Sequence, residues 1–292
     1  MADSGNGHRP ELSAEELALW SDLIERRSGL VFGEGRARFL AWCLWQRMRG
    51  LALGRYADYY RRVAVDSAEW AELAELVVNQ ESGFFRHQPS FDAVAARVVP
   101  ELAAARGRQG ISMLTAWSAG CADGREAYSL AMAMRAGLDA CGRADWQVRI
   151  CGSDLSERAL AAARRGRYPP SRLRTLPEAY RDRFMAPVGG DPRGSWEVDP
   201  GLRAAVTFGR LNLCRAAEPD DGHPVGLQDV VFCQNVLIYF RPELRQRVIA
   251  DLAGRLRPGG YLFPAPGEVV GLALPRMSLA RFDGALAYRR DG

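Results

Sequence analysis

The chain has 292 residues, is 48% hydrophobic and carries a formal net charge of +4. This length suffices for one large domain or two modest ones, each with a core of its own. All 39 basic residues are arginine, which excludes mechanisms that depend on a Schiff-base lysine or on the lysine of a phosphate-binding P-loop.

Neither a membrane segment nor a secretory signal is expected. No apolar run approaches the roughly 20 residues that a membrane span needs, and the first ten residues, MADSGNGHRP, lack an apolar centre. We therefore expect a cytoplasmic protein. The six cysteines form no CxxC pair and the three histidines lack metal-ligand spacing, so neither a metal site nor a disulfide framework is expected.

The N-terminal part is predicted to form a small helical domain over residues 11–90. Ser13 and Glu16 have the spacing of a capping box at the start of an amphipathic helix, which Gly29 would end. Further segments with helical spacing are residues 37–51, 55–64 and 68–78.

This domain also holds a local excess of positive charge. From Arg36 to Arg62 there are seven arginines against one acidic residue, Asp58. Such an excess favours an acidic partner. The alternative interpretation is an ordinary solvated helix face.

Residues 91–292 are predicted to form an α/β domain. Short apolar runs typical of buried strands lie at residues 111–119, 146–154, 205–213, 228–236 and 259–265. Segments with helical spacing separate them, which predicts an open, mostly parallel sheet doubly wound with helices on both faces. Asp283 and Gly284 lie between two alternating runs and predict a hairpin, and residues 166–203 are expected to be a small insertion with strands of its own.

Polar residues and glycines follow the ends of four predicted strands. They are Gly120 and Gly124, Asp154, Asn212 and Asn235. Ligands of open α/β sheets bind at the carboxyl ends of the strands, where a carboxylate such as Asp154 commonly accepts hydrogen bonds from ribose hydroxyls. Each residue has a structural alternative: a tight turn for the glycines, a helix N-cap for Asp154 and a turn for each asparagine.

Several common catalytic signatures are absent from the sequence. It has no GxGxxG, no Walker loop, no GxSxG and no paired-histidine site. Hydride transfer, phosphoryl transfer and hydrolysis therefore lack their usual residues, and a reaction that needs little acid or base catalysis fits best.

Five motifs occur in the order and at the spacing of the chemotaxis receptor methyltransferase family, CheR. They are ESGFFRHQPSF, WSAGCADGREAYSLAM, GSDLSERALAAARRGRY, RLNL and VVFCQNVLIYF, and the chain resembles the family from Leu17 to Arg289. The resemblance implies a methyltransferase fold after an all-α domain. It also implies methyl transfer from S-adenosylmethionine to glutamate side chains of chemoreceptors, with S-adenosylhomocysteine as the product. The expected partners are the cytoplasmic helices of methyl-accepting receptors, and the protein is expected to be near the membrane only through the receptor. Nucleic acid is not an expected partner. The protein is expected to be a monomer.

The resemblance also implies the site residues. The expected cofactor-binding residues are Gln80, Ser82, Arg86, Gly120, Glu126, Asp154, Asn212, Leu213, Asn235 and Val236. Arg86 would pair with the cofactor's carboxylate through its planar fork. Tyr239 would face the methyl group, with aromatic packing as the alternative, and Arg97 is a further candidate for orienting the incoming carboxylate. For Arg97 we favour the alternative of a surface charge on a helix.

The chain departs from the family pattern in several places. Gln80 and Ser82 stand where the family has asparagine and threonine, and Arg125 replaces an acidic residue beside Glu126. Near the end, PAPGEVV keeps Glu268 but replaces the family's GHSE. These changes motivate an alternative function, a catalytically weak, cofactor-binding regulatory protein. A nucleic-acid methyltransferase is a further alternative, suggested only by the arginine content.

Overall fold

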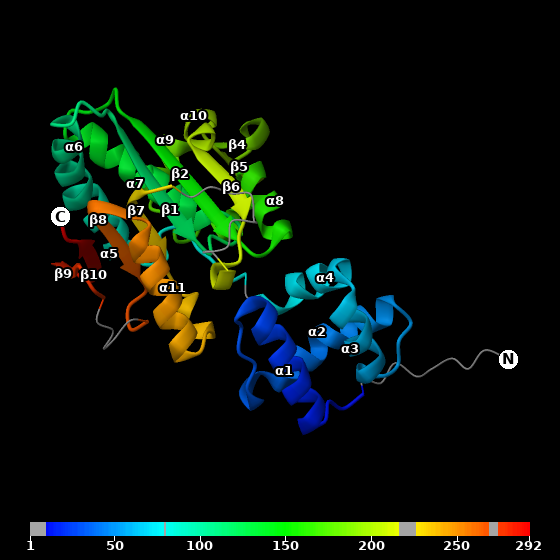
Figure 1. Cartoon of the computed structure of the whole chain (residues 1–292). Helices are drawn as coiled ribbons and strands as arrows, with labels where there is room; N and C mark the ends of the chain where they lie inside the picture. Colours follow the sequence, from blue (N-terminus) through cyan, green and yellow to red (C-terminus); the bar gives the residue numbers. More distant parts are fainter. Residues whose placement is uncertain (1–9, 79, 216–225, 269–273) are drawn as a thin grey trace. The chain divides into compact units, whose positions relative to one another are not determined.

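The computed structural model describes residues 10–78, 80–215, 226–268 and 274–292. Contacts divide the chain into two compact units, one formed by residues 1–79 with 239–241 and the other by the remainder (Figure 1). We expected the boundary at residue 90, but residues 80–90 belong to the second unit. The reason is that Phe84, Phe85 and Phe91 are buried in the core of that unit.

The first unit is helical, as predicted. Its elements are α1 (Ala14–Ser28), η1 (Glu34–Arg36), α2 (Ala37–Gly50), α3 (Tyr56–Val65) and α4 (Ser67–Val77). The capping box is confirmed, because the Ser13 hydroxyl accepts from the Glu16 N–H and the Glu16 carboxylate accepts from the Ser13 N–H, both at 3.1 Å. Gly29 ends α1 in the left-handed conformation, with φ 75°.

A buried carboxylate ties three of these helices together. Glu69 on α4 is 5% exposed and accepts hydrogen bonds from the Arg47 guanidinium at 2.8 and 2.9 Å and from the Tyr59 hydroxyl at 2.8 Å. Burial alone would raise the pKa of Glu69, but these hydrogen bonds outweigh it and lower that pKa. Arg47 is therefore part of the packing of the helical unit rather than a free surface charge.

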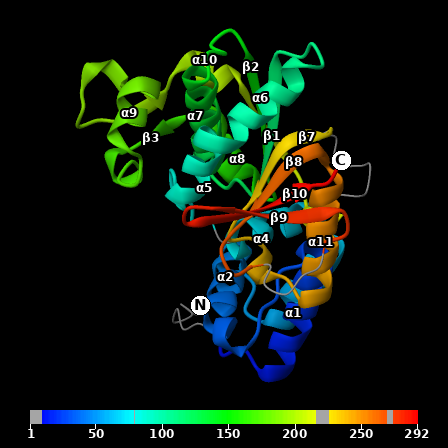
Figure 2. The same cartoon turned by 90° about the vertical axis from the view of Figure 1, so that its left-hand side faces the viewer.

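The second unit is built on a seven-stranded sheet with the order β6-β2-β1-β7-β8-β10-β9 (Figures 1 and 2). Its strands are β1 (Met113–Ala119), β2 (Gln147–Asp154), β6 (Val206–Arg210), β7 (Gln228–Cys233), β8 (Leu256–Pro264), β9 (Met277–Phe282) and β10 (Ala285–Arg290). The pairs from β6 to β8 are parallel, whereas β10 pairs antiparallel with both β8 and β9. The predicted hairpin is confirmed, with Gly284 at φ 68° in its turn.

Helices connect the parallel strands. They are α7 (Arg125–Ala140) between β1 and β2, α8 (Glu157–Arg165) after β2, and α11 (Pro242–Gly254) between β7 and β8. The chain moves outward from β1 through β2 to β6, and in the opposite direction from β7 to β8. Because such crossovers are right-handed, α7 and α8 lie on one face of the sheet and α11 on the other. The order therefore reverses between β1 and β7, the position where such sheets bind ligands.

A helical segment precedes β1, and a small insertion follows α8. The helical segment consists of α5 (Gln88–Ala93), the π-helical η2 (Val94–Val98) and α6 (Val99–Gly107). The predicted insertion contains its own antiparallel sheet, formed by β3 (Arg167–Tyr168), β5 (Trp196–Val198) and β4 (Met185–Pro187).

The remaining elements are η3 (Pro170–Arg172), α9 (Glu178–Phe184), η4 (Val188–Gly190), α10 (Pro200–Ala204), η5 (Leu213–Arg215) and η7 (Leu237–Tyr239). Within the described ranges, no helix has the length and apolar character needed to cross a bilayer.

Candidate functional site

Both glycines of the turn after β1 are required by packing. Gly120 has φ 80°, and a Cβ atom on it would lie 2.4 Å from Cγ2 of Val236. Gly124 has φ 86°, and a Cβ atom there would lie 2.6 Å from Cβ of Ala163 on α8. Gly120 thus leaves space for the side chain of Val236, one of the expected cofactor residues. Gly124 allows α7 to pack close to α8. The sequence does not show either packing contact, since it shows only two glycines at a turn.

Asp154 joins the ends of the first two strands. It is 8% exposed; its Oδ2 accepts from the Ala122 N–H and its Oδ1 from the Ser156 N–H, each at 2.9 Å. Ser156, not Asp154, caps α8, since its hydroxyl accepts from the Ala159 N–H at 3.0 Å. The N-cap alternative for Asp154 is therefore wrong. Carboxylate oxygens can accept more than one hydrogen bond, so these backbone contacts are compatible with the predicted contact to a ribose hydroxyl.

The segment before α5 reaches the same strand ends. The Gln80 amide donates to the Ser156 hydroxyl at 3.0 Å, which ties the start of the segment to the end of β2. Arg86 is exposed and donates to the Glu81 carbonyl at 3.0 Å, and Ser82 is half-buried. Gln80 therefore makes a defined hydrogen bond at the position where the family has asparagine.

Glu126, on the first turn of α7, is a carboxyl group with a strongly raised pKa. Its carboxyl group accepts from the Ser118 hydroxyl at 2.7 Å. Burial, reinforced by the nearby Glu268, raises the pKa of Glu126 to about 8 against the opposing effects of the Ser118 hydrogen bond and the Arg86 charge. The carboxyl group is consequently mostly protonated at pH 7, and a cation bound beside it would favour its ionisation.

The turn after β7 is held by Glu268, a contact that sequence reasoning missed. Glu268 is 3% exposed, and Oε2 accepts from the N–H groups of Asn235 at 3.1 Å and Ala265 at 3.0 Å. Its Oε1 accepts from the Ile238 N–H at 3.2 Å. These bonds fix Asn235 at φ 60°, a left-handed conformation that residues other than glycine rarely adopt. The available signal was an acidic residue inside an otherwise apolar segment.

The end of β6 lies beside the end of β2. The Leu211 N–H donates to the Asp154 carbonyl at 3.0 Å, and the Asn212 side-chain oxygen accepts from the Cys214 N–H at 3.1 Å. Leu213 is 7% exposed. Asn212 and Leu213 thus follow directly on a strand end that is bonded to Asp154.

The two candidates for positioning the reacting groups are Tyr239 and Arg97. Tyr239 groups with the helical unit, where its carbonyl accepts from the Val31 N–H at 2.9 Å and the Arg36 guanidinium lies 5.2 Å from the centre of its ring. Arg97 is exposed on the π-helical turn. This position matches a surface charge, the alternative that we favoured for Arg97.

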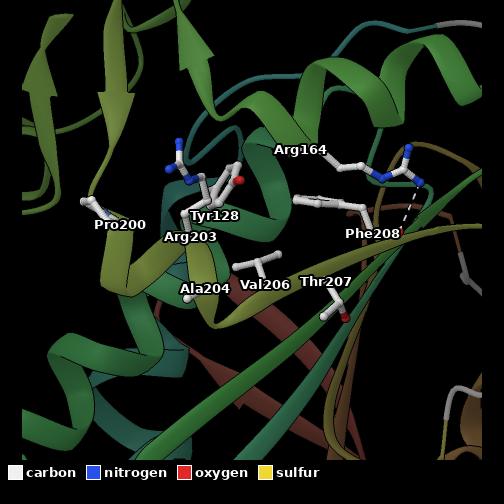
Figure 3. A pocket seen from close by; sticks show the side chains of 8 residues that line it. All are labelled: Tyr128, Arg164, Pro200, Arg203, Ala204, Val206, Thr207 and Phe208. Carbon is white, nitrogen blue, oxygen red and sulfur yellow. Dashed lines mark hydrogen bonds between the residues drawn. The ribbon is translucent and has the colours of Figure 1, made fainter.

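A separate groove lies on the outer side of β6 (Figure 3). Its volume is about 520 Å³, and its lining residues are Tyr128, Arg164, Pro200, Arg203, Ala204, Val206, Thr207 and Phe208. None of the expected cofactor residues lines it.

The charges at the strand ends fit the cofactor that the resemblance implies. S-adenosylmethionine carries a sulfonium and an ammonium group together with a ribose diol. Burial and the nearby Glu268 raise the proton affinity of the Glu126 carboxyl group, and a neighbouring cation would oppose this effect. Asp154 is the residue expected to accept hydrogen bonds from the diol. The roles of these residues in cofactor binding stay predictions; among the described residues, no cluster of ligands suited to a metal ion occurs.

Comparison with known proteins gives matches over nearly the whole chain. Residues 80–276 match the SAM-binding domain of the CheR methyltransferases, and residues 15–78 match their all-alpha domain. Chemotaxis protein methyltransferase 1 of Pseudomonas aeruginosa is 30% identical over 280 residues, which cover 94% of this chain and 97% of that protein. Chemotaxis protein methyltransferase 2 of the same organism is 31% identical over 254 residues, 87% of this chain and 86% of that protein. The chemotaxis protein methyltransferase of Klebsiella aerogenes is 31% identical over 264 residues, 89% of this chain and 85% of that protein.

Proposed function

Because the chain belongs to the CheR methyltransferase family, we propose that this S-adenosylmethionine-dependent methyltransferase esterifies glutamate side chains of chemoreceptors. The observation that carries the proposal is the grouping of Glu126, Asp154 and Asn235 at neighbouring strand ends of the sheet. A site of this composition suits a cationic cofactor with a diol, and the family match supplies the class of substrate.

The proposed reaction makes few demands on acid or base catalysis. When bound, S-adenosylmethionine supplies an electrophilic methyl group and leaves as the neutral thioether S-adenosylhomocysteine. A glutamate side chain is already ionised near pH 7, so its oxygen can attack without a general base. The protein's contribution is then alignment of the two reactants and exclusion of water.

Each residue at the strand ends has a different part in binding and aligning the cofactor. Asp154 holds the turn through the Ala122 N–H while offering lone pairs to the diol. Glu126 becomes ionised beside the cofactor's positive charge, which lowers the free energy of the bound cation. Glu268 fixes the turn that carries Asn235, so that the amide is held in place before the cofactor binds.

Exposed arginines of the helical unit support the proposal that this unit binds an acidic surface of the receptor. Of the arginines between residues 36 and 62, five are exposed: Arg38, Arg49, Arg55, Arg61 and Arg62. Arg61 and Arg62 lie near Asp58 and Asp66 respectively, and Arg47 is held by Glu69. The exposed charges outside these pairs are therefore the ones that we expect to meet the receptor.

A methylation assay with receptor fragments tests the proposal. Wild-type protein should transfer radioactive methyl groups to the fragment as a base-labile ester that releases methanol. Cofactor binding without any such label would refute the proposed activity and favour the alternative of a regulatory, cofactor-binding protein.

The docking role is tested by charge reversal. Replacing Arg38, Arg49 and Arg55 together by glutamate should raise the KM for the receptor fragment and leave affinity for S-adenosylhomocysteine unchanged. The matched control reverses three exposed arginines of the other unit, Arg108, Arg143 and Arg149. An equal effect of the two triple variants would contradict a specific docking surface.

A further inference from the structure

A cavity of about 470 Å³ lies at the carboxyl end of β8. Its walls come from the loop that follows β8, from the start of α5 and from the β9–β10 hairpin. The lining residues are His87, Ser90, Pro264, Ala265, Pro266, Gly267, Leu279, Phe282, Gly284, Ala285, Leu286 and Tyr288. The volume falls in the range of roughly 300 to 1,000 Å³ that is typical of binding pockets.

The described lining is mainly apolar and includes one short hydrogen-bonded chain. His87 Nδ1 and the Ser90 hydroxyl are 2.8 Å apart, and the Gln234 amide donates to the same hydroxyl at 3.3 Å. Burial lowers the pKa of His87 and so disfavours the charged form of its ring. Among the residues that the structure describes, the lining contains no carboxylate and no guanidinium. The cavity therefore suits an uncharged, apolar group rather than an ion.

Two leucines of the hairpin are left unusually exposed at this cavity. Leu279 is 45% and Leu286 49% exposed, although both belong to strands and border the cavity. Paired across the hairpin, Leu286 lies opposite Arg281 and Leu279 opposite Tyr288, so that both leucines are held on a regular, two-stranded frame. Covering them with another apolar surface would be favourable.

The cavity and the candidate cofactor site share three segments of the chain. His87 follows Arg86 directly, and Gly267 precedes Glu268, whose carboxylate holds Asn235. Gln234, which bonds the cavity residue Ser90, precedes that asparagine. A group bound in the cavity would therefore contact the same chain segments that carry the candidate cofactor residues.

We propose that this cavity binds the apolar side chains that flank the target glutamate on the receptor helix. The inference rests on the proposed function and adds a determinant of substrate choice to it. Residues three and four positions from the glutamate share its face of a helix, so they reach the enzyme together with it. The uncharged lining and the exposed leucines select apolar residues at those positions, while the adjacent cofactor site receives the carboxylate.

Aspartate at either exposed leucine tests the inference. In Leu279→Asp and Leu286→Asp, we expect the KM for a receptor fragment to rise about tenfold or more, because one apolar contact is lost and a charge is brought to the cavity. Calorimetry in the presence of S-adenosylhomocysteine should give the same weakening of fragment binding. The matched control is Leu227→Asp, which alters a leucine that is 45% exposed but lies outside the cavity.

A double-mutant cycle identifies the occupant. Alanine at the apolar residues flanking the modified glutamate should weaken binding to the wild-type enzyme, but should have little further effect on Leu286→Asp. Additive effects, or unchanged binding in both leucine variants, would overturn the inference and leave the cavity to another occupant. A wild-type enzyme that methylates no receptor fragment would instead refute the proposed function, and the inference with it.

Discussion

Replacing Glu126 by glutamine removes the ionisable group at the Ser118 contact while preserving an acceptor for the Ser118 hydroxyl. The pKa of Glu126 is raised from 4.5 to about 8 in the folded protein. Since the folded state binds this proton more tightly, the stability that it contributes is complete below pH 4.5 and is lost as pH rises through 8. Glutamine lacks this dependence, so the variant should become progressively more stable than wild type over this interval.

The size of the effect follows from the pKa difference. A shift from 4.5 to about 8 corresponds to about 5 kcal/mol at 1.36 kcal/mol for each pH unit. In urea denaturation without cofactor, the free energy of unfolding of Glu126→Gln minus that of wild type should therefore rise by about 4 kcal/mol between pH 5 and pH 8. Glu178→Gln serves as the control, because its side chain is 84% exposed.

The positive charge of the cofactor should lower the pKa of Glu126 when the cofactor binds. At pH 7, binding of S-adenosylmethionine should release about one proton from the wild-type protein, as measured by calorimetry in buffers of different ionisation enthalpy. Glu126→Gln should bind more weakly and release no proton at this site. A stability difference that does not vary with pH, together with equal proton release by both proteins, would refute the assignment of the raised pKa to Glu126.

Three further substitutions separate packing from cofactor binding. Gly120→Ala should lower the free energy of unfolding by about 1–3 kcal/mol, since its Cβ atom would clash with Val236 at positive φ; an unchanged urea midpoint would contradict this packing role. Asp154→Asn should weaken S-adenosylhomocysteine binding by about tenfold or more in calorimetry, and equal affinity would argue against the diol contact. Glu69→Gln should destabilise the helical unit by about 3–5 kcal/mol without changing that affinity, because its effect is confined to a buried ion pair.

Local sequence signals predicted the elements because their causes are local. The capping box of Ser13 and Glu16 acts within a single turn, and the hairpin depends on Gly284 alone for its left-handed turn residue. Alternation of buried strands with helices likewise predicted the parallel sheet. The expected domain boundary was eleven residues too late, because the burial of Phe84 and Phe85 depends on contacts with distant parts of the chain.

The candidate site was predictable only in part. The rule that ligands bind at strand carboxyl ends was enough to group Asp154, Asn212 and Asn235 from their positions in the sequence. It did not reveal that Glu268 holds the turn at Asn235. These two residues are 33 positions apart, and the Glu268 carboxylate bonds only the backbone N–H of Asn235, which has no signature in the sequence. The raised pKa of Glu126 was equally inaccessible, because it arises from burial and from the same distant carboxyl group.

By itself, the sequence determined the type of each major element, the edge of the sheet at which polar residues gather, and, through its motifs, the family. Tertiary structure alone decided the surroundings of those residues. It placed the Val236 methyl group that requires glycine at position 120 and the two backbone N–H groups that bond Asp154, and it raised the pKa of Glu126. The physical reason is distance along the chain. Periodicity and caps act over a few residues, whereas burial and electrostatic coupling depend on segments that only folding brings together.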